Sequence, residues 1–183
     1  MIVLLSSILA FIIIGILIFR LYLGHQAKKL SEDLTLSTDI PTEVDQVYQS
    51  KVINESDKED ILSSYEDDYQ RASKLNAWLD MFHVNATDEI VNLISSYESI
   101  DSIVERHNKQ VEEEILAKNK TFFDTCLKYP LDQQQRKAII ADEDNVLVVS
   151  SAGSGKTSSI VGKVKYLTEV KHVNPEKILL ISY

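Results

Sequence analysis

Cysteine and histidine are scarce in this chain of 183 residues. The only cysteine is Cys126, and the four histidines are scattered at positions 25, 83, 107 and 172. A single thiol excludes a disulfide scaffold, and the lack of Cys/His groups with metal-ligand spacing excludes a zinc site of that kind. We therefore expect Cys126 to behave as a small apolar residue in a reducing compartment.

Charge is also missing from part of the chain and strongly one-signed elsewhere. The first thirty residues contain no acidic side chain and carry a net charge of +3. Residues 31–114 carry −15 and residues 115–183 carry +3, for a total of −9. So uneven a distribution predicts a modular chain whose parts are to be interpreted separately.

No charged residue occurs between Ile2 and Phe19, a run of eighteen residues rich in Ile, Leu, Val and Phe. As a helix this run would measure roughly 27 Å, close to the hydrocarbon thickness of a bilayer. No basic residue precedes it and no Ala-x-Ala site follows, so a cleaved signal peptide does not fit. We predict a transmembrane anchor over residues 1–24, spanning Ile2 to Leu23. The nearby basic residues all follow the span, which predicts a single-pass membrane protein with a cytoplasmic C-terminal side. A buried helix of a soluble domain is the alternative.

The acidic region predicts helices without a nucleic-acid site. Residues 25–55 are polar and contain Pro41, which indicates a linker. Over residues 56–120, apolar positions recur at three- and four-residue intervals on both sides of a break at residues 83–88. We expect an acidic helical hairpin here, opened by a Ser56-x-x-Glu59 capping box. Its negative charge repels phosphate, so we interpret it as a spacer or a hairpin that binds a protein partner.

A glycine-rich loop near the C-terminus carries the chemistry. The run Asn145–Ser150 is apolar and β-branched, which predicts a buried strand, and apolar residues after Thr157 recur at helical spacing. A strand, a glycine-rich loop ending Gly-Lys-Thr and a helix predict a phosphate-binding loop. Gly153 and Gly155 let the backbone approach a phosphate. The catalytic candidates are Lys156, whose charge would meet the β- and γ-phosphates, and Thr157, the predicted Mg²⁺ ligand.

A second apolar run, Lys177–Tyr183, predicts another buried strand after a cap and a helical turn at Asn174-Pro175-Glu176. Two strands joined by a helix form a right-handed βαβ unit. We therefore expect an α/β fold, the start of a parallel P-loop sheet. Upstream, a helix from Leu131 to Asp142 with Asp132 as its N-cap is expected.

The segments Pro130–Ile139, Val146–Val149 and Ala152–Thr157 together resemble the opening of a UvrD/Rep-type superfamily-1 DNA helicase, and are most similar to the helicase IV branch. The resemblance covers residues 128–183 and nothing before them, and assigns residues 121–183 to a truncated UvrD-like ATP-binding domain with a Q motif, a Walker A loop and the start of motif Ia. It implies a RecA-like fold, ATP and Mg²⁺ as cofactors, and 3′-to-5′ translocation on single-stranded DNA. By the family's spacing Gln135 reads the adenine. The expected ATP-binding residues are Gln135, Ser150, Ser151, Ala152, Gly153, Ser154, Gly155, Lys156, Thr157 and Ser158.

Two positions of the loop depart from the family pattern. Ser150 stands where the family usually has Ala and the general motif has Gly, and Ser158 stands where many members have Arg.

The sequence stops at Tyr183, before any Asp-Glu strand motif, arginine finger or second RecA-like half. We expect the N-terminal piece of a longer helicase, able to bind nucleotide but inactive as an ATP hydrolase by itself. Two alternatives stay open: a membrane P-loop ATPase of another class, and a membrane-tethered interaction protein with a vestigial loop.

Overall fold

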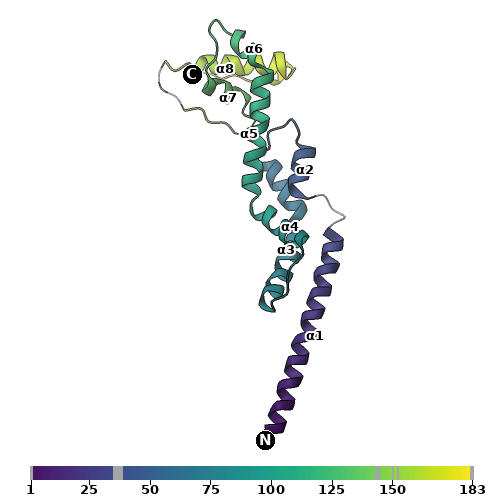
Figure 1. Ribbon diagram of the computed structural model, residues 1–183. Coiled ribbons are helices and arrows are strands. Elements are labelled where there is room, and N and C mark those ends of the chain that lie inside the picture. Colours follow the sequence, from purple (N-terminus) through teal and green to yellow (C-terminus); the bar gives the residue numbers. More distant parts are fainter. Residues whose placement is uncertain (1, 35–38, 143–144, 150, 152, 182–183) are drawn as a thin grey trace. The chain divides into compact units, whose positions relative to one another are not determined.

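The computed structural model describes residues 2–34, 39–142, 145–149, 151 and 153–181 (Figure 1). The chain divides into two compact units. The first unit comprises Met1–Val47 and Lys58–Ile103, and the second comprises Tyr48–Asp57 and Val104–Tyr183. These units are defined by packing and do not test the segment boundaries predicted from charge and hydropathy. Those boundaries therefore stay a prediction.

Helix α1 (Ile2–Leu34) has two dissimilar halves. Its C-terminal half packs on α3 (Glu55–Met81) and α4 (Asp88–Glu98). The short helix α2 (Ile40–Val47) lies between α1 and α3 in the sequence. In the preceding part of α1, the large apolar side chains from Ile8 to Ile18, together with Leu21 and Tyr22, are instead 45 to 76% exposed, whereas Phe19 is partly buried against the core. One buried cluster of this unit consists of Leu23, Ala27, Leu30, Leu34, Ala72, Leu79 and Ile90.

The turn that ends α3 is closed by its own backbone hydrogen bonds and is joined to α1 by a side chain of that helix. The N–H of Val84 donates to the carbonyl of Leu79 at 2.8 Å, and that of His83 donates to Asp80 at 3.1 Å. This pair of bonds is the Schellman motif, and His83 has the left-handed φ of 51° that the motif requires. The Arg20 guanidinium donates to the His83 carbonyl at 2.9 Å. His83 is therefore a structural residue of the turn.

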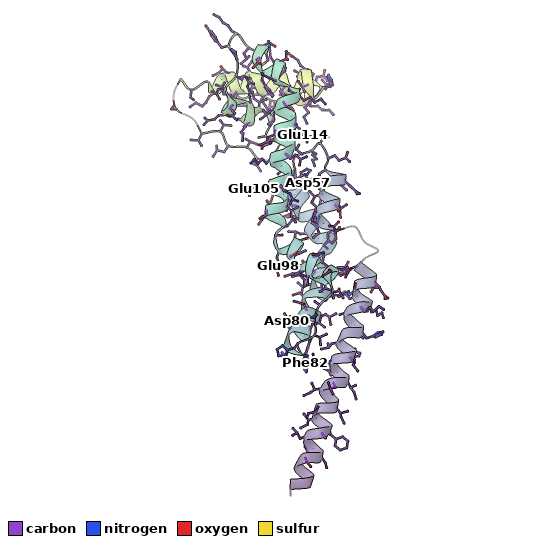
Figure 2. The ribbon with its side chains drawn as sticks, viewed as in Figure 1. Asp57, Asp80, Phe82, Glu98, Glu105 and Glu114 are labelled. Carbon is purple, nitrogen blue, oxygen red and sulfur yellow. The ribbon has the colours of Figure 1, made fainter. Side chains whose placement is uncertain are left out.

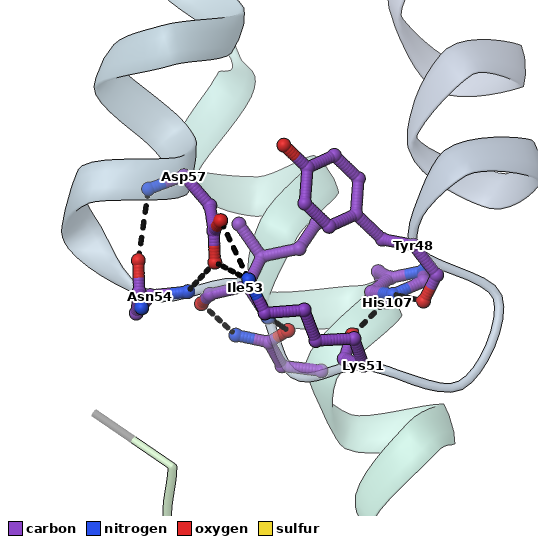
Figure 3. Close-up of polar contacts among 7 residues, drawn as sticks. Tyr48, Lys51, Ile53, Asn54, Asp57 and His107 are labelled. Atoms are coloured by element: carbon purple, nitrogen blue, oxygen red, sulfur yellow. Dashed lines mark hydrogen bonds and ion pairs between the residues drawn. The ribbon is translucent and has the colours of Figure 1, made fainter. Parts of the chain in front are cut away.

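Helix α3 is capped by a pair that differs from the predicted one. The side-chain oxygen of Asn54 accepts from the N–H of Asp57 at 2.8 Å, and the Asp57 carboxylate accepts from the N–H of Asn54 at 3.2 Å (Figure 3). The helix already begins at Glu55, so the predicted capping box at Ser56 and Glu59 is wrong. Asn54 offers the same spacing two residues earlier, where the backbone is still outside the helix.

The segment before α3 is bound to α5 (Ile100–Lys118) by two polar side chains in the second unit. Asn108 donates to the carbonyl of Ile53 and accepts from its N–H, both at 2.8 Å. The buried His107 ring has Nε2 3.1 and 3.2 Å from the carbonyl oxygens of Tyr48 and Lys51 (Figure 3). Carbonyls only accept, so this nitrogen carries the proton and donates to them.

The rest of the second unit consists of short helices. These are α6 (Lys120–Thr125), α7 (Gln133–Ile140), α8 (Lys156–Lys165), a π-helical turn (Tyr166–Val170) and a 3₁₀ turn (Pro175–Lys177). Burial raises the pKa of the Cys126 thiol, which lies in the core as expected. One buried cluster of this unit consists of Phe123, Cys126, Leu131, Ile139, Ile140 and Tyr166.

The expected α/β class is wrong for the part of the chain that the structure describes. Residues 146–149 and 178–181 were expected to be buried strands, but they have no regular secondary structure. Leu147, Val149 and Leu179 are 88, 85 and 84% exposed. Local sequence favours an extended backbone here, but a parallel strand also needs hydrogen-bonding neighbours and cover on both faces. Without that ladder the RecA-like sheet is absent, and the described chain is helical.

Candidate nucleotide-binding site

The glycine-rich loop forms a tight turn into the start of α8. Gly153 and Gly155 have φ of 80° and 86°, the left-handed region that side chains with a Cβ rarely adopt. Between them, the Ser154 hydroxyl donates to the carbonyl of Ser151 at 2.8 Å. Gly155 is the N-cap of α8, and Lys156 is its first residue. The loop therefore leads directly into the N-terminal end of α8.

The first turn of α8 has the properties of an anion-binding site. The first intrahelical bond runs from the N–H of Ser159 to the carbonyl of Gly155 at 2.9 Å. N–H groups at a helix start lack carbonyl partners in their own helix, and the helix dipole is positive there. Lys156 and Thr157 are exposed on this turn, with Ser158 half-buried next to them. A positive helix end, one lysine and two hydroxyl side chains thus occur within one helical turn, which is the combination of groups that binds a phosphate.

Gln135 connects the helix before the loop to the loop itself. Its side-chain oxygen accepts from the N–H of Asp132 at 3.0 Å, while the Asp132 carboxylate accepts from the N–H of Gln135 at 2.9 Å. The other end of the amide, Nε2, donates to the carbonyl of Ser154 at 3.4 Å. A Cβ built on Gly155 would lie 2.4 Å from this nitrogen. A side chain at position 155 would therefore be strained by its φ and would displace the end of the Gln135 side chain.

Helices α7 and α8 are packed closely enough to hold Gln135 at the loop. A Cβ built on Gly162 would lie 2.6 Å from Cδ1 of Ile139 and 3.3 Å from Cδ1 of Leu131. The Lys163 ammonium donates to the carbonyl of Ala141 at 2.6 Å. Burial lowers the pKa of Lys163, since it disfavours the charged form.

Not every expected site residue falls within the described chain. Ser150 and Ala152 lie outside it. Among the described residues, no group of three or more His, Cys, Asp or Glu side chains is arranged to hold a metal ion. The Thr157 hydroxyl, adjacent to Lys156 at the helix start, stays the candidate Mg²⁺ ligand.

Two features of the site were missed in the sequence. Asp132 was expected as an N-cap and is one, but the reciprocal bond from Gln135 was not foreseen. The Asp-x-x-Gln spacing is that of a capping box, and it could have predicted this bond from the sequence. The contact between Lys163 and Ala141 joins residues 22 positions apart, and no local pattern indicates it.

Comparison with known proteins places the similarity at this end of the chain. The family model of the UvrD/REP helicase N-terminal domain matches residues 131–183. DNA helicase IV of Escherichia coli strain K12 is 34% identical over 84 residues, which are 46% of this chain and 12% of that protein. DNA helicase II of the same strain is 36% identical over 53 residues, 29% of this chain and 7% of that protein. The probable DNA helicase of Mycoplasma pneumoniae is 40% identical over 53 residues, 29% of this chain and 10% of that protein. No solved structure matches significantly.

The similarity to helicase IV extends further upstream than expected. Its 84 residues cannot fit between residue 128 and the C-terminus, so the matched segment begins at or before residue 100. The sequence similarity to helicase IV thus includes residues upstream of α7. The resemblance to the N-terminal portion of UvrD-type helicases is confirmed, and its expected start at residue 128 is wrong.

Proposed function

We propose that this chain, whose residues 131–183 match the UvrD/REP helicase N-terminal domain, is the nucleotide-binding N-terminal part of an ATP-dependent DNA helicase. The observation that carries the proposal is the position of Gln135, whose amide contacts the carbonyl of Ser154 in a loop with two left-handed glycines. The residue expected to read adenine and the loop expected to bind phosphate thus lie next to each other.

The roles of the residues follow from their chemistry. The Lys156 ammonium would neutralise the β- and γ-phosphates, and the N–H groups of the first turn of α8 would bind the same oxygens. The Thr157 hydroxyl would bind Mg²⁺, whose contribution is to neutralise charge on the phosphates. Single-stranded DNA is the proposed substrate of the complete protein, and its contacts would lie outside the strongly acidic residues 31–114.

Nucleotide binding is tested by titrating the full chain, in detergent or a nanodisc, with a fluorescent ATP analogue. Lys156→Ala should weaken binding about tenfold or more, because a hydrogen bond to a charged group contributes roughly 1.5 to 3 kcal/mol. Lys171→Ala is the matched control, an exposed lysine of the same unit beyond the π-helical turn. Equal binding by both variants would refute the proposal. Competition by GTP as effective as that by ATP would favour another class of P-loop ATPase.

We also propose that α1 anchors the protein in a membrane, with the C-terminal domain in the cytoplasm. The helix is long and apolar enough to cross a bilayer, and only 6% of its most apolar window is buried by the rest of the chain. A continuous apolar surface of this extent is unfavourable in water.

Carbonate extraction of membranes tests the anchor. The protein should stay in the membrane fraction, and replacing Ile13 and Ile14 by Lys should release it, since each Lys at a span centre costs about 2.5 to 3.5 kcal/mol. Lys at Val47 and Val91, exposed apolar positions outside α1, should leave the protein membrane-bound. Release of the unmodified protein by carbonate would overturn the anchor.

A further inference from the structure

Four aromatic rings gather in the first unit where the apolar run of α1 ends. Phe19 lies 4.8 Å from Phe82 and 6.1 Å from Trp78, measured between ring centroids. Tyr22 stacks beside Phe19 at 6.2 Å, and Trp78 stacks on Phe82 at 6.1 Å. Phe82 directly follows the end of α3, and Figure 2 shows it and Asp80 at that end of the helix. The turn after α3 therefore lies level with the last residues of the proposed span.

This aromatic cluster is only partly covered by the protein. Trp78 and Tyr22 are 50 and 53% exposed, and Met81 is 66% exposed. These large apolar surfaces continue the exposed apolar face of α1. The arrangement matches the aromatic belt of membrane proteins, where rings lie between the hydrocarbon and the headgroups.

Basic side chains of α1 and α3 follow the aromatic cluster in the direction away from the span. A groove of about 490 Å³ between α1 and α3 begins at the aromatic side chains and continues past Lys74 and Lys29 to Arg71. From Trp78 to Arg71 the helix rises roughly 10 Å, comparable to the depth of a headgroup layer. Arg71 is paired with Asp33 and Asp68, at 3.2 and 3.0 Å.

We propose that the turn joining α3 to α4 is seated in the membrane interface. Trp78 and Met81 enter the headgroup–acyl boundary, while Lys29 and Lys74 lie at the level of the lipid phosphates. The occupant of this surface is the lipid bilayer, because the order from hydrocarbon to ring to cation on the protein is the order of the bilayer itself. Asp80, in the last turn of α3, limits the depth to the headgroup region. This inference rests on the proposed membrane anchor.

Trp78 is the only tryptophan of the chain, so its fluorescence reports this turn alone. The full chain is reconstituted into phosphatidylcholine vesicles containing nitroxide lipids, labelled either at the headgroup or at the end of the acyl chain. We expect a blue-shifted emission, stronger quenching by the headgroup label than by the acyl-end label, and protection from aqueous iodide. Vesicle flotation in the same samples reports the anchor independently.

Three variants at two equally exposed positions sharpen the test. Met81→Asp should reduce lipid quenching of Trp78, and Met81→Gln should reduce it less. Val47→Asp, at a residue that is also 66% exposed, should leave it unchanged. If the protein floats with the vesicles but iodide quenches Trp78, the proposed position of the turn in the membrane interface is wrong and the anchor stands. Shielding from iodide without lipid quenching assigns the surface to a second copy of the chain and also overturns the proposal. Protein that does not float overturns both.

Discussion

The contact between Gly155 and Gln135 predicts a measurable coupling across the candidate site. Gly155→Ala places a side chain at a φ of 86°, which costs about 1 to 2 kcal/mol for an L-residue. The new Cβ would also lie 2.4 Å from Nε2 of Gln135. The glutamine amide must move away, and its bond to the N–H of Asp132 is lost, at about 1 kcal/mol. We therefore expect a total loss of roughly 2 to 3 kcal/mol.

A double-mutant cycle separates the two contributions. Gln135→Ala alone removes the capping bond and should cost about 1 kcal/mol. In that background Gly155→Ala meets no glutamine, so the double variant should be no less stable than Gly155→Ala alone, a coupling of about 1 kcal/mol. Gly153 is the control, because its φ is 80° but no atom of the described residues lies within 4 Å of its built Cβ. Gly153→Ala and Gln135→Ala should therefore be additive.

Hydrogen exchange of peptides covering α7 and α8 in the full chain measures these local free energies. Additivity of Gly155→Ala with Gln135→Ala would show that the glutamine amide does not contact the loop. That result would also remove the main support for nucleotide binding at this loop.

Three further predictions concern single residues. His83 has a φ of 51°, so the variant His83→Gly should be more stable than His83→Ala by about 1 kcal/mol. This order is the same as at a helix C-cap and the reverse of that in a helix interior. Urea unfolding followed by Trp78 fluorescence measures the difference, and a more stable His83→Ala variant would contradict the prediction. The hydrogen bond to Glu66 raises the pKa of Tyr97 to about 12, so this bond stabilises the fold below pH 10 and is lost as the pH rises to 12. Urea midpoints should therefore fall more steeply over that range than in Tyr97→Phe, and parallel slopes would exclude the contribution. Asn108→Ala leaves both backbone groups of Ile53 without their partner and should cost about 1 to 3 kcal/mol, with Asn108→Asp intermediate; unchanged hydrogen exchange of residues 48–57 would refute it.

The candidate site could be located in advance because its signals are short-range. The backbone at Gly153 and Gly155 and the cap at Asp132 depend on neighbours within a few residues, and the structure contains both. The expected capping box of α3 failed on the same scale, because Asn54 and Ser56 offer nearly equal patterns. Only the position of the helix start distinguishes them.

The chain's own residues determined the apolar run of α1, the acidic charge of residues 31–114 and the glycine-rich loop, since composition and local sterics suffice for each. The tertiary structure decided the remainder. Residues 146–149 have the composition of a strand but form none, because a strand exists only through hydrogen bonds to a neighbour. Likewise, the contact of Phe19 with Phe82 and the bond from Gln135 to Ser154 join residues far apart in the chain. Such contacts depend on how helices pack, which no local pattern encodes.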